Sequence, residues 1–402
     1  MRSITGNKWI LAIIVIAQFF CTSLWFAGNA ILPDLIKNLQ LAPGVLANLT
    51  SAVQFGFITG TLIFAVLTIS DRFSPSRVFF VSAMVAALFN LAIAIPSIPF
   101  GGLLLFRFFT GFFLAGIYPI GMKIASDHYQ QGLGKSLGFL VGALVLGTAF
   151  PHLLKSLSAG LPWRYVIYAV SLLSVLGGVA MVLLVPDGRY RKPGMQLTST
   201  AFLAGFRNAK FRAAAFGYFG HMWELYAFWA FVPVMLAAYK NYYPQAKLDV
   251  SFLSFLIIGC GALACVFSGL LSQKYGAKKI AGIALSFSGL CCIVSPFFLL
   301  NPSPVVLLAF LFFWGLVVIA DSPLFSTLVA QAAPEQSRGT SLTIVNCIGF
   351  SITILSIQLV NVLAAHVPSR YVYLVLAAGP LLGLMALLGK EKGMAGKIKN
   401  KN

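Results

Sequence analysis

The sequence has very few charged residues. Only nine of its 402 residues are acidic, and charged residues of both signs make up 9% of the chain. A soluble globular domain carries about 25% charged residues. Because 59% of the residues are hydrophobic, this composition excludes an ordinary soluble fold, and most of the chain must be solvated by lipid.

Cysteine and recognisable catalytic motifs are also scarce. All six cysteines fall within apolar stretches, without a disulfide framework or metal-ligand spacing, so we interpret them as small packing residues. The sequence contains no recognisable nucleotide-binding loop, metal-binding cluster or pair of nucleophile and base. No polar region is long enough to form a catalytic domain. We therefore expect no cofactor, no metal site and no enzymatic activity, and any transport must draw on gradients.

What the chain does have is a series of apolar stretches of about 20 residues, long enough to cross a bilayer as helices. The twelve stretches are 9–31, 45–70, 78–95, 100–124, 133–153, 165–185, 213–236, 250–271, 280–300, 305–330, 341–365 and 372–388. The first is too long for the core of a signal peptide, so we count it as an uncleaved span. The predicted fold class is all-α, a polytopic membrane protein with twelve transmembrane helices.

The basic residues are sorted by membrane side. The net charge is +19, which could suggest nucleic acid, but 21 of the 28 lysines and arginines fall on the side of the N-terminus, six fall on the other side, and Arg107 lies within a span. Cytoplasmic loops carry such an excess of basic residues. We therefore expect no nucleic-acid partner, both termini in the cytoplasm, and a multi-pass protein in a plasma membrane of the bacterial inner-membrane type.

The chain divides into two similar sets of six spans. A polar linker separates the sets, and Pro119 and Pro323 lie 204 residues apart in the fourth and tenth spans. Two copies that start from the same membrane side form parallel repeats, with a solute site between them near the midplane. The predicted organisation is an N-terminal bundle (1–186), a basic cytoplasmic linker (187–212), a C-terminal bundle (213–389) and a cytoplasmic tail (390–402).

Two loops at equivalent positions carry a family resemblance. The loop at 269–279 reads GLLSQKYGAKK and resembles the loop signature G-x-L-x-D-R-x-G-R-K of the major facilitator superfamily, with Gln273 in place of the acid. The first-half loop keeps Asp71 and Arg72, and the fourth span adds Arg107-Phe-Phe-Thr-Gly111. The resemblance covers essentially the whole chain and implies a fold of two parallel six-helix bundles.

In that family these loops form charge networks that lock and release the cytoplasmic gate. The resemblance therefore implies a gating role for Asp71, Arg72, Lys274, Lys278 and Lys279. The alternative is that they are ordinary charges at the membrane edge.

Ionisable residues within the spans are rare and expensive, so they are candidates for function. Arg107, Glu224 and Asp321 fall in the fourth, seventh and tenth spans, which line the central cavity in the family. Glu224 and nearby His221 are the best candidates for handling protons, with Asp321 similar. Two alternatives stay open: Glu224 could be a structural partner of Arg107 across the cavity, and Arg107 could bind an anionic solute.

Polar and aromatic residues complete the candidate site. Gln18, Thr22, Trp25 and Asn29 follow one another at spacings of four, three and four, which predicts one helical face that either meets solute or packs against another helix. The candidate aromatic residues in the cavity are Trp25, Trp223, Trp229 and Trp314. Trp314 lies seven residues before Asp321, which predicts an aromatic wall beside that carboxylate.

These observations favour a proton-coupled secondary carrier of a small organic solute that works by alternating access as a monomer. One rival keeps the fold without coupling, as a uniporter. Another is a siderophore or drug exporter, although Gly138, Gly142, Gly147 and Pro151 echo the fifth-helix motif of drug exporters only in part. A membrane enzyme or receptor is the most distant rival, and the solute and the direction of transport stay open.

Overall fold

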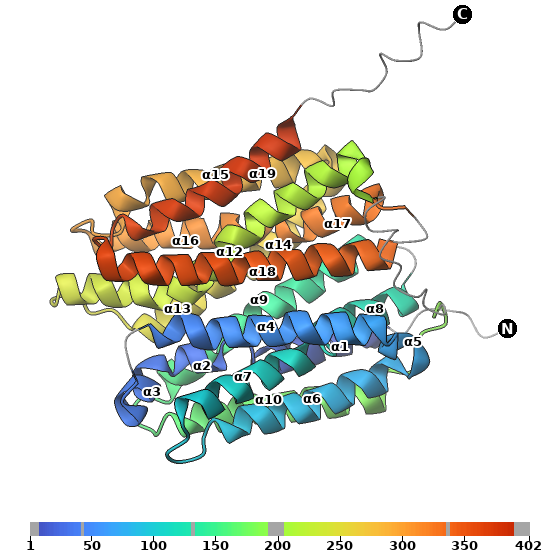
Figure 1. Ribbon diagram of the computed structural model, residues 1–402, viewed down its shortest axis with the longest axis horizontal. Helices are drawn as coiled ribbons and strands as arrows, with labels where there is room; N and C mark the ends of the chain where they lie inside the picture. Colours follow the sequence, from blue (N-terminus) through green and yellow to red (C-terminus); the bar gives the residue numbers. More distant parts are fainter. Residues whose placement is uncertain (1–7, 42–43, 130–132, 192–204, 335–337, 390–402) are drawn as a thin grey trace, which may run out of the picture.

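The computed structural model describes residues 8–41, 44–129, 133–191, 205–334 and 338–389. Every regular element in these ranges is a helix. Ten helices are long and apolar enough to cross a membrane, and two shorter apolar helices, Trp9–Thr22 and Val372–Leu388, supply the first and last spans. The prediction of twelve spans is thereby confirmed (Figure 1).

Within the described residues, the first six spans contain ten helices. They are α1 (Lys8–Thr22), α2 (Ala27–Ala30) and α3 (Leu32–Leu39) in the first span, α4 (Val45–Val66) followed by the short α5 (Ile69–Arg72), α6 (Pro75–Ala92), α7 (Phe100–Leu114) with α8 (Tyr118–His128), α9 (Leu133–Leu157) and α10 (Arg164–Leu184). We call them the N-half.

The last six spans form the C-half. Its helices are α12 (Ala209–Tyr242), α13 (Val250–Gly259) with α14 (Gly261–Tyr275), α15 (Ala277–Phe298), α16 (Pro304–Ala320) with α17 (Ser322–Ala332), α18 (Arg338–His366), and the 3-10 helix η2 (Val372–Ala377) with α19 (Ala378–Leu388). Residues 192–204 of the predicted linker and the predicted tail 390–402 lie outside the described residues. The exact domain boundaries stay predictions.

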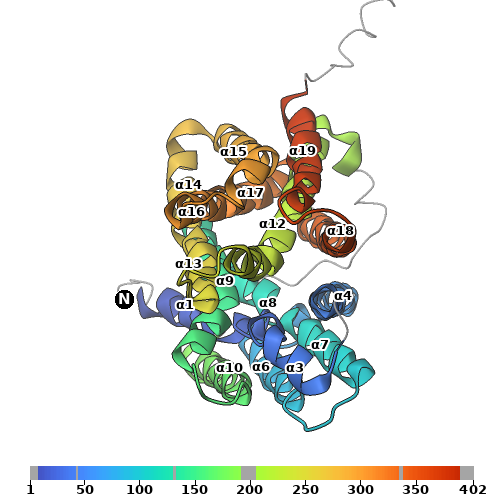
Figure 2. The ribbon, with the colours of Figure 1, turned by 90° about the vertical axis from the view of Figure 1, so that its left-hand side faces the viewer.

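The two halves lie side by side with their helices roughly parallel to one axis (Figures 1 and 2). Two pairs of spans make most of the interface between them: α4 packs against α18, and α9 packs against α13 and α14. These are spans two with eleven and five with eight, so the pairs are equivalent under the internal repeat. We call the end with Arg72, Lys123 and Lys278 the basic end, and the other the opposite end.

Helix breaks recur at equivalent places. The fourth span breaks just before Pro119, between α7 and α8, and the tenth breaks just before Pro323, between α16 and α17. Proline lacks a backbone N–H and its ring clashes with the preceding turn, so an interruption is expected at both sites. The first span also breaks, between Thr22 and Ala27, although no proline lies there.

Glycines let α4 and α7 approach closely. A Cβ atom added to Gly56 would lie 1.9 Å from the Phe108 carbonyl oxygen, and one added to Gly111 would lie 2.0 Å from the Val53 carbonyl oxygen. Backbone oxygens in packed helices cannot move aside as a flexible side chain can. Small residues at such contacts are a usual device of helix packing in membranes.

We therefore expect Gly111→Ala to destabilise the N-half by roughly 1 to 3 kcal/mol through overpacking. Gly101→Ala is the control in the same helix, because a Cβ atom at Gly101 would meet nothing within 4 Å. The measurement is the midpoint of thermal aggregation in detergent, followed by size-exclusion chromatography. Equal midpoints for the two variants would contradict this packing.

Candidate functional site

Hydrogen bonds between the halves close the opposite end. The Ser156 hydroxyl of α9 donates to the Asp249 carboxylate at the start of α13, with 2.5 Å between Oγ and Oδ2. On the other helix pair, Nε2 of Gln358 in α18 donates to Asn48 Oδ1 at 3.3 Å and Ser51 Oγ at 3.0 Å. Both contacts join one half to the other, so the interface is fastened at this end.

Asp249 is suited to this contact because it stays ionised. Partial burial raises its pKa, but the Phe252 N–H and the Ser156 hydroxyl stabilise the carboxylate and leave the pKa below its ordinary value. The Phe252 N–H donates to Asp249 Oδ1 at 2.9 Å, which also caps α13.

A layer of aromatic side chains fills the interface at mid-height. We call it the central aromatic layer; its members are Trp25, Phe26, Phe57, Tyr226, Trp229 and Phe350. Trp25 is at its centre, with ring centroids 4.8 Å from Phe57 in its own half and 5.7 and 5.9 Å from Phe350 and Tyr226 in the C-half. The layer is thus built by both halves and would have to open when they move apart.

Buried polar groups without a partner occur on the rings of this layer and elsewhere on the helices that carry it. The indole N–H groups of Trp25 and Trp229, both atoms of the Gln54 amide and the side-chain oxygen of Asn29 have no hydrogen bond within the described ranges. All four side chains are buried. An unsatisfied buried polar group costs about 1 to 3 kcal/mol. The two indole N–H groups belong to rings at the interface between the halves, where they could hydrogen-bond a solute.

Arg107 lies inside the N-half and not in this layer. Its guanidinium donates to the carbonyl oxygens of Leu24, at 3.1 Å, and Trp25, and it lies 3.4 Å from Asn90 Oδ1. Those carbonyls belong to the break in the first span, so Arg107 satisfies groups that the lost helical turn leaves free. The alternative in which Arg107 pairs with Glu224 is therefore wrong.

Glu224 lies inside the C-half, among α12, α15 and α16. Its carboxylate accepts hydrogen bonds from Ser288 Oγ at 2.5 Å, Trp314 Nε1 at 2.6 Å and Cys292 Sγ at 3.2 Å. The predicted wall of Trp314 beside Asp321 is therefore wrong. Seven residues span about 10 Å along a helix, so Trp314 meets α12 at the level of Glu224, and Asp321 meets it nearer the basic end.

Asp321 pairs with His221. The distance between Asp321 Oδ1 and His221 Nδ1 is 2.8 Å, and both side chains are buried. Asp321 occupies the junction between α16 and α17. This acid and base can share a proton at a point where the helix is already interrupted.

The predicted stripe on the first span does not form one face. Thr22 donates to the carbonyl oxygen of Gln18 and to that of Ala143 in α9, and Asn29 donates to Thr50 in α4. The Gln18 amide lies against α8, because a Cβ atom at Gly121 would be 2.1 Å from its oxygen. The helix break between Thr22 and Ala27 changes the directions in which the side chains on its two sides point. Of the four residues, only Trp25 therefore joins the aromatic layer.

Trp223 also points away from the layer. Its indole N–H donates to the Val375 carbonyl oxygen at 3.1 Å, which joins the seventh span to the twelfth. Trp229, which the sequence marks equally, is in the layer. Both lie on α12, and spacing alone does not reveal which tryptophan faces the other half.

Comparison with known proteins decides the family. The model of the Major Facilitator Superfamily matches residues 14–357 and, in a second match, residues 214–399. The chain belongs to the major facilitator superfamily. It is thus a multi-pass membrane protein of a transporter family.

Individual relatives are more distant. The chain is 37% identical over 90 residues to the probable inorganic phosphate transporter 1-3 of Arabidopsis thaliana, covering 21% of this chain and 17% of the relative. It is 29% identical over 142 residues to the probable inorganic phosphate transporter 1-4 of Oryza sativa subsp. indica, covering 33% and 26%. The matches thus span less than a third of either relative.

A solved structure shows the same fold. The crystal structure of the human organic anion transporter MFSD10 (TETRAN) superposes with a TM-score of 0.72 at 14% identity, covering 94% of this chain and 99% of that one. At this identity the likeness concerns the fold alone.

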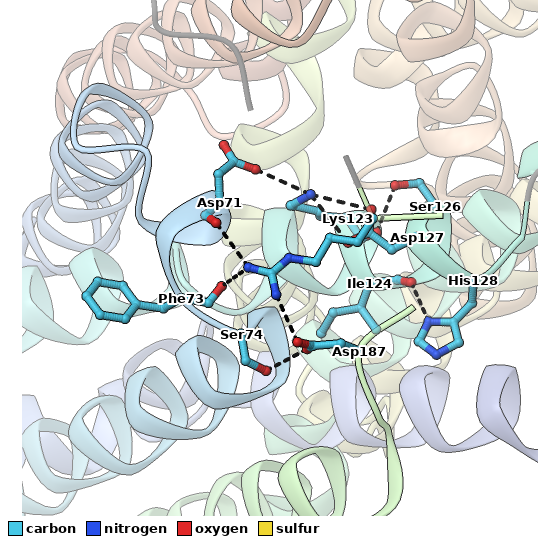
Figure 3. Close-up of polar contacts among 10 residues, drawn as sticks. Asp71, Phe73, Ser74, Lys123, Ile124, Ser126, Asp127, His128 and Asp187 are labelled. Carbon is cyan, nitrogen blue, oxygen red and sulfur yellow. Dashed lines mark hydrogen bonds and ion pairs between the residues drawn. The ribbon is translucent and has the colours of Figure 1, made fainter. Parts of the chain in front are cut away.

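The superfamily signature loop of the N-half takes part in a charge network at the basic end (Figure 3). Lys123 Nζ lies 3.4 Å from Asp71 Oδ1 and 3.3 Å from Asp127 Oδ2. Arg191 lies 2.8 Å from Asp187 and donates to the carbonyl oxygen of Asp71 at 3.0 Å. The network therefore ties α5, α8 and the start of the linker together.

Sequence reasoning found only part of this network. The loop resemblance indicates Asp71 but gives no role in such a network to Lys123, Asp127, Asp187 or Arg191. The i,i+4 spacing of Lys123 and Asp127 was the available signal. Arg72, which was predicted beside Asp71, instead donates to Thr68 Oγ1 at 3.1 Å.

Proposed function

We propose that this protein is a secondary carrier that moves a small organic solute across the membrane by alternating access, with the solute held at the central aromatic layer. The observation that carries the proposal is the pair of buried, unpartnered indole N–H groups, of Trp25 and Trp229, in a layer of rings contributed by both halves. A site made by both halves can face either side in turn as the halves rock.

The chemistry of the layer favours a solute with a flat apolar body and a few hydrogen-bonding atoms. The indole N–H groups of Trp25 and Trp229 are donors, and the Gln54 amide can donate and accept. The aromatic faces would bury the apolar part. These side chains are all neutral, so the layer itself provides no charge for an anion.

An organic anion or phosphate is a second candidate. The printed names of the relatives and of the similar structure favour it, and so does Arg107, whose Nε has no partner in the described part of the chain. An anion would have to draw the guanidinium away from the carbonyls of Leu24 and Trp25.

We further propose that protons drive the transport. Glu224 and the pair of His221 and Asp321 are buried titratable groups within the C-half. A proton on either site would change the hydrogen bonds that hold the C-half helices together. A uniporter, the rival without coupling, would show no accumulation driven by a pH gradient across vesicles.

The remaining parts of the proposal concern orientation and gating. The excess of basic residues at one end supports cytoplasmic termini in a bacterial-type inner membrane, and we expect a monomer. Asp71 and Arg72, with Lys274, Lys278 and Lys279 in the second loop, would govern the gate at the basic end. The bonds at the opposite end would break when that side opens.

The solute site can be tested through Trp25. A thermal-shift panel of aromatic amino acids, monocarboxylates and inorganic phosphate would identify a stabilising compound. Trp25→Phe keeps an aromatic ring, although a smaller one, and removes the N–H, so we expect the apparent Kd of that compound to rise about tenfold, the equivalent of one hydrogen bond. Trp223→Phe is the control, because its N–H is already bonded away from the layer. An unchanged Kd for Trp25→Phe would refute the site.

Alternating access can be tested by a cross-link at the opposite end. Ser156→Cys with Asp249→Cys places two thiols where the side chains touch at 2.5 Å. We expect oxidation to reduce transport more than tenfold and reduction to restore it, because the halves could no longer separate. Ser156→Cys alone is the control, since a single thiol cannot form the bridge between the halves. Equal loss of transport in the single and the double variant would argue against rocking.

A further inference from the structure

The C-half has a cavity at the basic end, separate from the proposed solute site, whose lining includes two of the lysines assigned to the gate. Its volume is about 1100 Å³, and it lies among α14, α15, α17 and the end of α19. Phe287, Leu324 and Leu328 line its apolar part, and Lys278 and Lys279 stand at its polar part. A neighbouring cavity of about 690 Å³ shares Lys278 and adds further basic side chains, Lys210 and Arg212.

The internal repeat explains why a cavity exists here. Helices α8 and α17 have the same length and lie 204 residues apart. By that offset Lys123 and Asp127 correspond to Thr327 and Gln331, and Gln273 replaces the acid of the signature loop. All three neutral residues line the cavity. The N-half fills this place with its own ion pairs (Figure 3), and the C-half leaves it open.

The charge balance differs between the halves in the same way. Lys123 in the N-half has two carboxylates within ion-pair distance. Lys278 and Lys279 are exposed, and neither lies in an ion pair within the part of the C-half that the structure describes. The cavity therefore presents positive charge above an apolar lining, without the carboxylates that its counterpart has.

We propose that this cavity binds an anionic phospholipid of the leaflet at the basic end. The phosphate would lie at Lys278 and Lys279, and an acyl chain would follow Ile283 and Phe287, whose side chains are 45% and 46% exposed on α15. Basic pockets between transmembrane helices bind anionic headgroups in this manner. The chain's own last residues, 390–402, contain five lysines and one glutamate, so charge disfavours them as the occupant.

The test is lipid retention by the full-length protein in detergent, measured by native mass spectrometry with phosphatidylglycerol and phosphatidylcholine of identical acyl chains. We expect preferential retention of phosphatidylglycerol. Lys278→Gln with Lys279→Gln should weaken it about 30-fold, because each basic residue near a lipid surface contributes about 1 kcal/mol. Lys37→Gln with Lys247→Gln, two exposed lysines at the opposite end, should retain wild-type binding.

A second variant tests the apolar part. Gly269 lines the cavity, and a Cβ atom there would meet nothing within 4 Å, so Gly269→Leu should fold and displace the acyl chain, lowering retention of phosphatidylglycerol. Equal retention of both lipids by the wild type would overturn the proposal. The proposal would also be overturned if inorganic phosphate alone raised the thermal midpoint as much as phosphatidylglycerol does. That result would assign the lysines to a free anion. Undiminished retention by the double lysine variant would refute the headgroup position.

Discussion

Arg107→Ala is expected to leave little folded protein, because it should lower the free energy of unfolding by about 3 to 5 kcal/mol. The guanidinium donates to the carbonyl oxygens of Leu24 and Trp25, and each carbonyl left without a donor in apolar surroundings costs about 1 to 3 kcal/mol. The empty space beside Gly28, whose added Cβ atom would lie 3.4 Å from Arg107 Nε, adds to the loss.

The measurement is the yield of monodisperse protein on size-exclusion chromatography together with the thermal midpoint. Arg107→Lys should recover part of the stability, because a compact ammonium reaches fewer carbonyls than the forked guanidinium. Arg164→Ala is the control: Arg164 also donates to a backbone carbonyl, that of Ala94 at 3.1 Å, but it lies at the edge of the N-half.

The result also separates the two candidate solutes. If Arg107→Ala gave a stable protein that had lost only its response to organic anions or phosphate, Arg107 would be an anion site, and the second candidate would replace the first. A stable variant with full transport would contradict both roles.

The sequence predicts the spans well because the thickness of the bilayer sets the length of each apolar run. It also predicts two of the breaks, since Pro119 and Pro323 interrupt the backbone hydrogen bonds. The break after Thr22 has no such local cause. It depends on Arg107, which is 82 residues from Trp25 in the chain, and a contact of that kind has no local signal.

The partners of the buried charges are harder to predict from the sequence than the spans. A helix in a membrane bundle is apolar both towards lipid and towards its neighbours, so periodicity says little about its rotation. Glu224 was placed on the right span, but its bonds to Ser288 and Trp314 depend on that rotation. The stripe from Gln18 to Asn29 failed for a related reason, because its spacing assumed one unbroken helix.

The structure separates the neutral solute layer from the titratable groups. Glu224 bonds to α15 and α16, and Asp321 pairs with His221 across α12 and the junction of α16 and α17. Coupling in the proposed mechanism would therefore act through the packing of the C-half. The Glu224 carboxylate accepts from three donors, and a proton on one of its oxygens would weaken that oxygen as an acceptor. The contacts of α12, which carries Tyr226 and Trp229 of the layer, would thereby loosen.

Glu224→Gln should consequently abolish uphill accumulation while solute exchange continues. Glutamine keeps the shape of the side chain and removes its titration, and its oxygen can still accept from Trp314 Nε1 or Ser288 Oγ. Proteoliposomes with an imposed pH gradient measure accumulation, and counterflow without a gradient measures exchange. Wild-type accumulation by this variant would remove Glu224 from the coupling.

Asp34→Asn is the matched control, because that carboxylate lies in an ion pair at the opposite end and away from the proposed proton sites. It should accumulate solute as the wild type does. Loss of both accumulation and exchange in Glu224→Gln, with an unchanged thermal midpoint, would instead indicate that α12 must hold a carboxylate for any movement of the halves. Loss of accumulation alone would show that transport against a gradient requires a titratable side chain at position 224. It would also exclude the uniporter, since a uniporter has no coupling to lose.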